Sequence, residues 1–215
     1  TDSLGVPALD QLGWAYEGDV AGVTGSIIAG RPVQVVREHP WPLTPLPKNV
    51  CEEASDPAAR IIVSDRTADA ASVDDADLPT VVLHPRSLVV GMGCNKGTDV
   101  DHLRTLLDDT LAEARLAPGS VTILTSHEVK AGELGMIKLA HERGLEYLTH
   151  SAEELAAQQV PTPSDVVARE VGTPSVSEAS VLAQGAELVV TKHKTPEATI
   201  AIGRIPARGH LSVGG

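Results

Sequence analysis

Three glycines and a lysine follow a predicted strand, and this combination is suited to binding an anion. The segment reads Gly91-Met92-Gly93-Cys94-Asn95-Lys96-Gly97, directly after a Val-rich strand and before a helix. Glycines let backbone N–H groups approach an anion closely, and the helix N-terminus adds partial positive charge. We expect Gly91, Gly93 and Gly97 to supply backbone donors, Lys96 a full charge, and Cys94 a further contact. The alternative is a tight strand-to-helix turn with a packed thiol.

A hydroxyl-rich stretch further along the chain offers a second candidate for an anion site. Thr173 and Ser175 precede or begin a predicted helix, and Glu178 follows Ser175 at S-x-x-E spacing. This spacing is that of a capping box, in which the two side chains satisfy N–H groups of the first helical turn. The functional alternative is that Thr173, Ser175 and the helix start line a pocket for an anion or carboxylate. Both interpretations remain open.

Two lysines occur near the end of the sequence on a predicted strand. Lys192 and Lys194 are two residues apart, so both side chains point to one face of the sheet. On a chain with a formal net charge of −12, two cations on one face would attract a polycarboxylate. The competing interpretation is that the lysines protect an edge strand from aggregation.

One segment resembles a zinc site but lacks a required ligand. His127-Glu128-Val129-Lys130-Ala131 begins like the helix of a zinc protease, but Ala131 stands where the second histidine is needed. We therefore reject a zinc interpretation of this segment.

Composition excludes several classes of protein. Aromatic residues make up 2% of the 215 residues and Phe is absent, so the chain has few stacking platforms for nucleic acid, which its negative charge would also repel. No apolar run approaches the roughly 18 residues of a membrane span. Two distant cysteines predict neither a disulfide framework nor a zinc pattern. We predict a reduced, cytoplasmic protein that binds neither nucleic acid nor membrane.

The elements that position these residues alternate between strand and helix. Two short helices are predicted over 7–16 and 18–29, and a Pro-rich connection over 39–48. Runs rich in Val, Ile and Leu predict strands at 32–37, 60–64, 80–83, 87–92, 121–124 and 145–148, and a final hairpin at 188–192 and 198–203. Helical periodicity predicts helices at 99–115, 132–143, 152–159 and 175–184.

This alternation predicts an α/β protein with two parts. Residues 1–85 are expected to form a smaller α/β domain, and residues 86–215 a three-layer α/β/α domain with a mixed sheet. In such a sheet, loops at the carboxyl ends of the strands gather into binding sites.

Several segments in order resemble the CbiG family of cobalamin biosynthesis. Thr1-Asp2, followed by Val6-Pro-Ala-Leu-Asp10 and Gly13-Trp14, resembles the join between its N-terminal and middle regions. Ile62-Val-Ser-Asp-Arg66 resembles the strand motif near the end of its middle region. The segments that resemble its C-terminal, CobE-like region are His84-Pro-Arg-Ser-Leu-Val-Val-Gly-Met-Gly-Cys94, Ser151-Ala-Glu-Glu-Leu155, Pro161-Thr-Pro-Ser164 and Val171-Gly-Thr-Pro-Ser-Val176. The histidine- and glycine-rich N-terminal region of that family does not occur in these 215 residues. The last residues, Gly209–Gly215, resemble the first strand of a tetrapyrrole methyltransferase.

The resemblance implies hydrolysis of cobalt-precorrin 5A to cobalt-precorrin 5B, with opening of a lactone and release of acetaldehyde. It implies a large anionic corrinoid substrate that brings its own cobalt, so neither a protein metal site nor a further cofactor is expected. In this setting the candidate pocket combines the 91–97 segment, Thr173, Ser175, Lys192 and Lys194, and Glu178 is the candidate general base. A partial enzyme, fused or bound to a precorrin methyltransferase, is expected, and a homo-oligomer is compatible with it. The alternatives are a non-catalytic corrinoid-binding module and, least favoured, a nucleotide-phosphate-binding protein.

Overall fold

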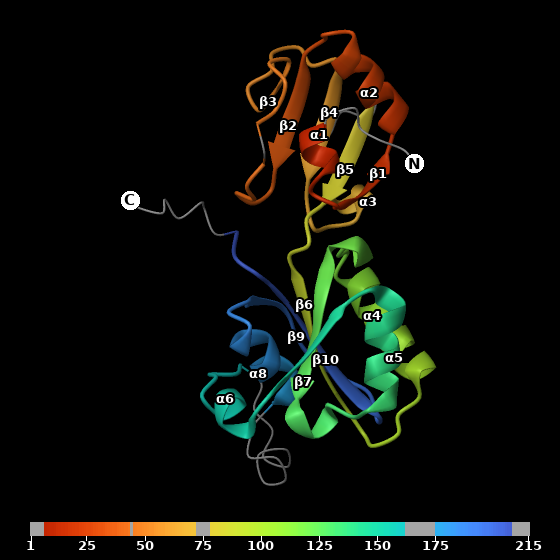
Figure 1. Cartoon of the computed structure of the whole chain (residues 1–215), viewed down its shortest axis with the longest axis vertical. Helices are drawn as coiled ribbons and strands as arrows, with labels where there is room; N and C mark the ends of the chain where they lie inside the picture. Colours follow the sequence, from red (N-terminus) through yellow and green to blue (C-terminus); the bar gives the residue numbers. More distant parts are fainter. Residues whose placement is uncertain (1–6, 44, 72–77, 162–174, 208–215) are drawn as a thin grey trace. The chain divides into compact units, whose positions relative to one another are not determined.

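The computed structural model describes residues 7–43, 45–71, 78–161 and 175–207 and consists of two compact units (Figure 1). Among these residues, the first unit contains those before Ser87 together with Arg115–Ser120 and Ala207. The second unit contains Ser87–Ala114 and those between Val121 and Pro206. Within the described residues, no helix has both the length and the apolar character needed to cross a membrane.

The first unit is a five-stranded sheet with helices on its faces. Strands β5, β4, β2 and β3 are parallel, and β1 is antiparallel to β5. Helix α2 begins after Asp19, whose carboxylate accepts the Gly22 N–H at 2.8 Å, and packs on the sheet over an aliphatic core. In chain order the elements are α1 (Pro7–Asp10), β1 (Ala15–Gly18), α2 (Val20–Ile28), β2 (Val33–Arg37), β3 (Val50–Cys51), β4 (Ala59–Val63), α3 (Ala68–Ala71) and β5 (Thr80–His84).

The second unit is a mixed sheet in the order β8-β7-β6-β10-β9. Strands β6, β7 and β8 are parallel, and β10 is antiparallel to both β6 and β9, so β9 runs in the same direction as β6. Its elements are β6 (Leu88–Cys94), α4 (Val100–Glu113), β7 (Val121–His127), η2 (Glu128–Lys130), α5 (Leu134–Arg143), β8 (Glu146–His150), α6 (Ala152–Ala156), α8 (Val176–Ala183), β9 (Glu187–Lys194) and β10 (Ala198–Arg204). The short turn η1 (Pro118–Ser120) precedes β7.

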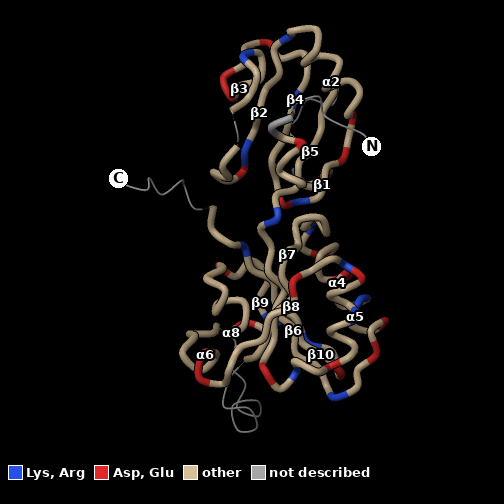
Figure 2. The backbone as a smooth tube through the Cα atoms, in the orientation of Figure 1, with Lys and Arg blue, Asp and Glu red and all other residues tan. Residues whose placement is uncertain are grey.

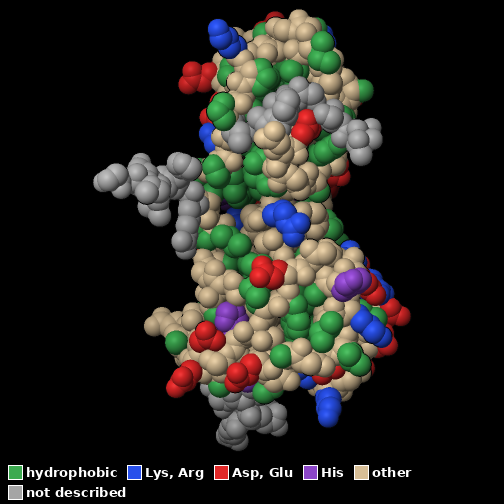
Figure 3. All heavy atoms as spheres, in the orientation of Figure 1, with side chains coloured by type: hydrophobic (Ala, Val, Ile, Leu, Met, Phe, Trp, Pro, Cys, Tyr) green, Lys and Arg blue, Asp and Glu red, His purple; other side chains and the backbone are tan. Residues whose placement is uncertain are grey.

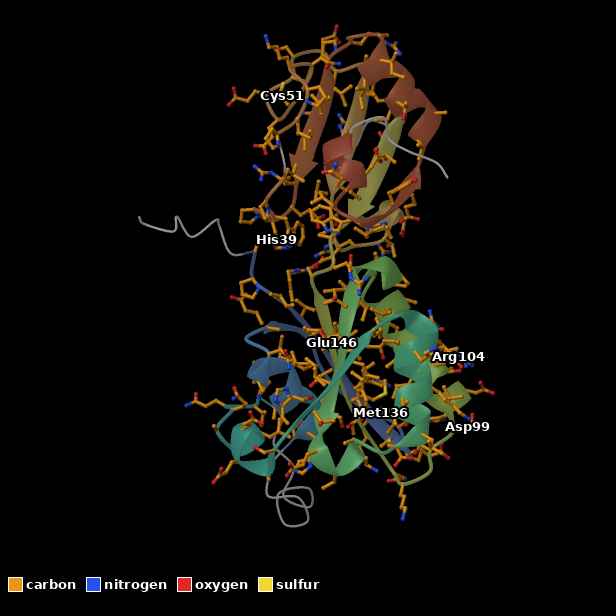
Figure 4. All side chains as sticks on the ribbon, viewed as in Figure 1. His39, Cys51, Asp99, Arg104, Met136 and Glu146 are labelled. Carbon is orange, nitrogen blue, oxygen red and sulfur yellow. The ribbon has the colours of Figure 1, made fainter. Side chains whose placement is uncertain are left out.

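Helices cover both faces of this sheet, so the predicted three-layer α/β/α architecture is confirmed (Figure 1). Helices α4 and α5 lie on one face, and α6 and α8 on the other. The apolar stripe predicted for α4 is buried at Leu103, Leu106, Leu107 and Leu111. Met136 is fully buried and points from α5 towards the sheet (Figure 4).

Strand β9 is irregular in its pairing with β10. Ile202 faces Val190, but Ile200 faces His193, so β9 spends one more residue than β10 between these two pairs. A second shift lies between the pairs Ile202–Val190 and Gly203–Leu188. Such bulges change the local register and bend the strand.

Strands β1 and β6 differ from the sequence prediction. Ala15–Gly18 is strand β1 and not part of a helix, because its backbone pairs with β5 along the edge of the first sheet. Strand β6 continues to Cys94, so Gly91 and Gly93 lie inside a strand and not in a turn. Their backbone groups pair with β7 and β10 across the sheet.

Gly91 allows α8 to lie close against the sheet. A Cβ at this position would overlap with the backbone carbonyl oxygen of Ser177 and would come within 2.8 Å of Ser180 Oγ. Gly91 φ is not in the left-handed region, so packing and not backbone conformation requires the glycine.

Replacing Gly91 with alanine is expected to lower the free energy of unfolding by at least about 1–3 kcal/mol, because the new methyl group overpacks the interface between α8 and β6. Chemical denaturation followed by circular dichroism measures the change. The control is Gly132→Ala, where a Cβ meets no atom within 4 Å, and its effect should stay within about 0.5 kcal/mol. Equal stability of the two variants would contradict the packing argument.

Candidate functional site

A cavity of about 300 Å³ lies at the edge of the second sheet where β6, β7 and β9 end. These three strands run in the same direction, so Cys94, His127 and Lys194 reach the same edge. The start of α8 and the tip of the hairpin between β9 and β10 complete the walls. The lining residues are Gly93, Cys94, Asn95, His127, Val129, Lys130, Ser175, Val176, Lys192, Lys194, Thr195, Pro196, Glu197, Ala198 and Thr199.

Five residues that the sequence nominated line this cavity together. They come from three separate parts of the sequence and are Gly93, Cys94, Ser175, Lys192 and Lys194. A Cβ on Gly93 would lie 3.0 Å from Thr199 Oγ1, so the glycine keeps this wall open. Whether these residues bind a substrate stays a prediction.

The other residues of the nominated segment lie elsewhere. Gly91 packs against α8, and Lys96 and Gly97 lie outside the cavity lining in the exposed turn after β6. The Gly97 N–H, predicted to bind an anion, already donates to Glu133 Oε1 at 2.8 Å. The other carboxylate oxygen of Glu133 accepts a hydrogen bond from Lys130 Nζ at 3.2 Å. The Glu133 carboxylate of the protein thus accepts the hydrogen bond that the sequence analysis predicted for a bound anion.

Hydrogen bonds and cations hold Glu133 in its charged form. Burial works to raise the pKa of this carboxyl, but the Gly97 N–H and the ammonium groups of Lys130 and Lys96 outweigh it and hold the pKa below its usual range. The Lys130 carbonyl also accepts the Tyr147 hydroxyl at 2.7 Å. This network fixes η2 and the turn after β6 beside the cavity.

Glu178, the predicted general base, is fully buried and is not among the residues that line the cavity. Its Oε1 accepts the backbone N–H of Lys192 at 3.0 Å and so joins α8 to β9. The predicted capping box is wrong within the described residues, because the Ser175 side chain makes no capping hydrogen bond to α8. That arrangement occurs instead at α6, between Ser151 and Glu154. Thr173 and the terminal segment 209–215 lie outside the described residues.

Cys94 is a half-buried thiol at the end of β6. Burial raises its pKa, aided by the charge of Glu133 and opposed by Lys130 and by a hydrogen bond with Thr98. Burial also raises the pKa of the nearby Tyr147 hydroxyl. Both groups are therefore neutral at pH 7, and Cys94 is suited to packing more than to nucleophilic attack.

We expect Cys94 to react with iodoacetamide more slowly than the exposed Cys51 at pH 7.5, because the thiolate is the reactive form and the Cys94 pKa is raised. Mass spectrometry of Cys51→Ser and Cys94→Ser variants gives each rate separately. Raising the pH to about 10 should narrow the difference. Faster alkylation of Cys94 at pH 7.5 would show that the thiol is activated.

His127 is a residue of the cavity that the sequence analysis dismissed together with the zinc motif. Its Nδ1 accepts the Val129 N–H at 3.0 Å, so the neutral ring carries its proton on Nε2. The side chain is 3% exposed, and Nε2 has no hydrogen-bond partner within the described part of the chain. Leaving a buried donor unpaired costs about 1–3 kcal/mol. In the sequence, the signal that could have nominated His127 was its position at the end of a predicted strand, next to the strand that ends at the glycine-rich segment.

Burial lowers the pKa of His127 below 6.5, and the charge of Glu128 offsets this in part. The unfolded chain therefore binds this proton more readily than the folded chain. His127 lowers the free energy of unfolding as pH falls below about 6.5, and the loss is complete once pH passes its folded pKa.

Urea denaturation at pH 7.5 and 5.5 should therefore show a smaller loss of stability in His127→Asn than in the wild type. Asparagine keeps an acceptor for the Val129 N–H but does not titrate. His141→Gln, at an exposed position, serves as the control and should keep the wild-type pH dependence. Identical dependence in wild type and His127→Asn would contradict the assignment.

Two ion pairs join helices α4 and α5 away from the cavity. On α4 and α5, Arg104 pairs with Glu142 at 2.7 Å and Arg143 with Asp108 at 2.6 Å. Figure 2 shows charged residues of both signs along these helices, Figure 3 shows charged side chains of both signs on this side of the molecule, and Figure 4 shows Arg104 on the outer side of the helices. These contacts join the two helices on the face of the sheet opposite α8.

The first unit contains a second polar cluster. Ligand atoms of Glu38, His39 and Asp65 lie within 4.8 Å of one another, near a hollow of about 480 Å³ beside β2. Glu38 already accepts the Ser64 hydroxyl at 2.6 Å, and the His39 ring contacts Trp41 edge-on. These contacts account for two of the three side chains without a bound ion.

Residues 88–203, which form the second unit's sheet and helices, match the family model described as the C-terminus of cobalamin synthesis protein G. This chain belongs to the CbiG family. Residues 7–85 match the model of the central region of the same cobalamin biosynthesis protein. The predicted resemblance is therefore confirmed in both parts of the chain.

Curated proteins of similar sequence agree with the family. A cobalt-precorrin-5A hydrolase of Priestia megaterium is 32% identical over 213 residues, which cover 91% of this chain and 56% of that protein. Protein CobE of Sinorhizobium is 28% identical over 120 residues, covering 54% of this chain and 78% of CobE. This CbiG-family chain thus spans little more than half the length of the hydrolase.

A solved structure resembles part of this chain. The crystal structure of CobE, a protein from the cobalamin biosynthetic pathway, has a TM-score of 0.52 and 31% identity. The similarity covers 54% of this chain and 92% of CobE.

Proposed function

We propose that this CbiG-family chain is part of a hydrolase that converts cobalt-precorrin 5A to cobalt-precorrin 5B in cobalamin biosynthesis. The observation that carries the proposal is the match to a cobalt-precorrin-5A hydrolase along 91% of the chain. The cavity supports it, because three lysines line a single hollow on a chain of net charge −12. Such a hollow suits a substrate that carries several carboxylates.

The proposed reaction consumes one water molecule. Water adds to the lactone carbonyl, and the C–O bond breaks to give a carboxylate and a hydroxyl on the former meso carbon. That carbon then leaves with its methyl group as acetaldehyde, and the electron pair of the broken C–C bond stays on the macrocycle, which takes up a proton. A base for water and donors for the oxyanion are needed. Cobalt belongs to the substrate, so we propose no cofactor held by the protein.

A second candidate function is a non-catalytic corrinoid-binding module. Two observations favour it: the similarity to CobE covers 54% of this chain and 92% of CobE, and the Glu178 carboxylate joins α8 to β9 instead of lining the cavity. The catalytic base would then lie in a part of the hydrolase that this chain does not span.

We place the chain in the cytoplasm, which the free thiols of Cys51 and Cys94 support. We propose no nucleic-acid or membrane partner. Association with a precorrin methyltransferase, or with a second copy of the chain, stays a prediction.

Anaerobic incubation with cobalt-precorrin 5A tests the proposal, with trapped acetaldehyde and the visible spectrum as readouts. The hydrolase proposal predicts acetaldehyde release, and a base role for Glu178 predicts that Glu178→Gln lowers the rate at least about 100-fold. Glutamine keeps an oxygen to accept the Lys192 N–H, so the variant should fold.

The remaining outcomes separate the two candidates. Release that is unaffected in Glu178→Gln leaves the hydrolase proposal standing and removes Glu178 from it. A spectral shift without acetaldehyde identifies a binding module. Neither signal from the folded chain would reject both functions.

A further inference from the structure

Two buried side chains that line the cavity have a polar atom without a hydrogen-bond partner among the described residues. The proton on Nε2 of His127 follows from the Val129 N–H bond to Nδ1, and Nε2 has no partner among the residues described. Buried polar groups in folded proteins are nearly always paired, so an unpaired one calls for a specific explanation. A ligand atom in the adjoining cavity would supply the missing acceptor.

Ser175 is a second such group in the same cavity. Its side chain is 2% exposed, and its Oγ has no hydrogen-bond partner within the described residues. It occupies the N-cap position of α8 without making the capping bond. Ser175 and Val176 both line the cavity, so the N-terminus of α8 faces it and contributes partial positive charge.

The charged groups around these two donors favour an anion. Lys130, Lys192 and Lys194 line the cavity, and Lys130 is also paired with Glu133 at 3.2 Å. Among the described residues of the lining, Glu197 is the one acidic residue, and its carboxylate lies 3.2 Å from His102 Nδ1. Donors, cations and a helix N-terminus together match a carboxylate better than a neutral or cationic group.

The volume of the cavity limits what can enter it. Cavities for whole drug-sized ligands span roughly 300–1,000 Å³, and this cavity of about 300 Å³ lies at the lower limit. A whole tetrapyrrole macrocycle is too large for a cavity of this volume, but one of its carboxylate arms fits. Val129 lines the cavity and is 68% exposed, so it offers an apolar contact for the rest of such a ligand outside.

We propose that the cavity is a subsite for one carboxylate arm of the ligand, held by hydrogen bonds from His127 Nε2–H and the Ser175 hydroxyl beside Lys192 and Lys194. The naming of the ligand as a corrinoid rests on the proposed function, whereas the carboxylate specificity rests on the donors and charges of the cavity. His127 is thus a binding residue that donates a hydrogen bond to a carboxylate arm of the substrate.

The test uses propionate as the probe and the neutral isostere propionamide as its control, both at constant ionic strength. Histidine labelled with ¹⁵N reports on the Nε2 of His127, and its resonance is assigned by its absence in His127→Asn. Propionate should shift this resonance in a saturable manner, and propionamide should bind at least about tenfold more weakly.

Variants of the two donors sharpen the test. His127→Asn keeps the acceptor for the Val129 N–H but loses the donor at Nε2, and Ser175→Ala loses the hydroxyl. Each should weaken propionate binding about tenfold, and His127→Gln, which returns an N–H near the Nε2 position, should recover part of the loss. The matched control is Ser177→Ala, because Ser177 Oγ is also buried and unpaired within the described residues but does not line the cavity. Its affinity should equal that of the wild type.

The same variants separate this inference from the proposed function. If cobalt-precorrin 5A binds equally well to folded wild type, His127→Asn and Ser175→Ala, the subsite is wrong even if hydrolysis occurs. If propionate binds at His127 but cobalt-precorrin 5A is neither bound nor hydrolysed, the carboxylate subsite stands and the proposed function fails. An unchanged His127 resonance, or equal binding of propionamide, would also overturn the subsite.

Discussion

The close approach of α8 to β6 is the contact on which the rest of the second unit depends. It requires a residue without a Cβ at Gly91, because the carbonyl oxygen of Ser177 fills the space that a side chain would take. With the helix seated there, its N-terminus reaches the edge where β6 and β7 end, and Glu178 reaches the backbone of β9. One packing requirement thus places a donor at the cavity and ties the last strand to the helix.

The two sides of the cavity differ in how their polar groups are paired. On the side of η2 the Glu133 carboxylate binds both the Gly97 N–H and Lys130, so the glycine turn is internally satisfied. On the side of α8 and β7 the donors of Ser175 and His127 remain unpaired within the described residues. The unpaired donors among the described lining residues therefore lie on the side of α8 and β7. The raised pKa of Cys94, caused first by burial, is consistent with a packing role for that thiol.

Local sequence patterns were sufficient for most of the fold and for part of the site. The apolar run Leu88–Val90 and the helical spacing of the leucines in α4 predict elements that bury these side chains, and the side chains are buried. Strand β1 was missed because Ala15–Gly18 is short and its stability comes from pairing with β5, which is distant in sequence. Gly91 was recognised as unusual for the wrong reason, since only the position of α8 reveals the overlap. His127 was missed because its significance depends on an unpaired nitrogen, which no residue pattern encodes.

The bulges in β9 let the strand change length without moving the end that reaches the cavity. Thr199 faces Lys194 and Gly203 faces Leu188, so β9 spends two more residues than β10 between these pairs. One extra residue lies between Val190 and His193, and deletion of a single residue there would give the two strands equal lengths between their paired positions. His193 would still face Ile200 and Lys194 would still face Thr199, so the cation would stay at the cavity while the strand lost part of its bend.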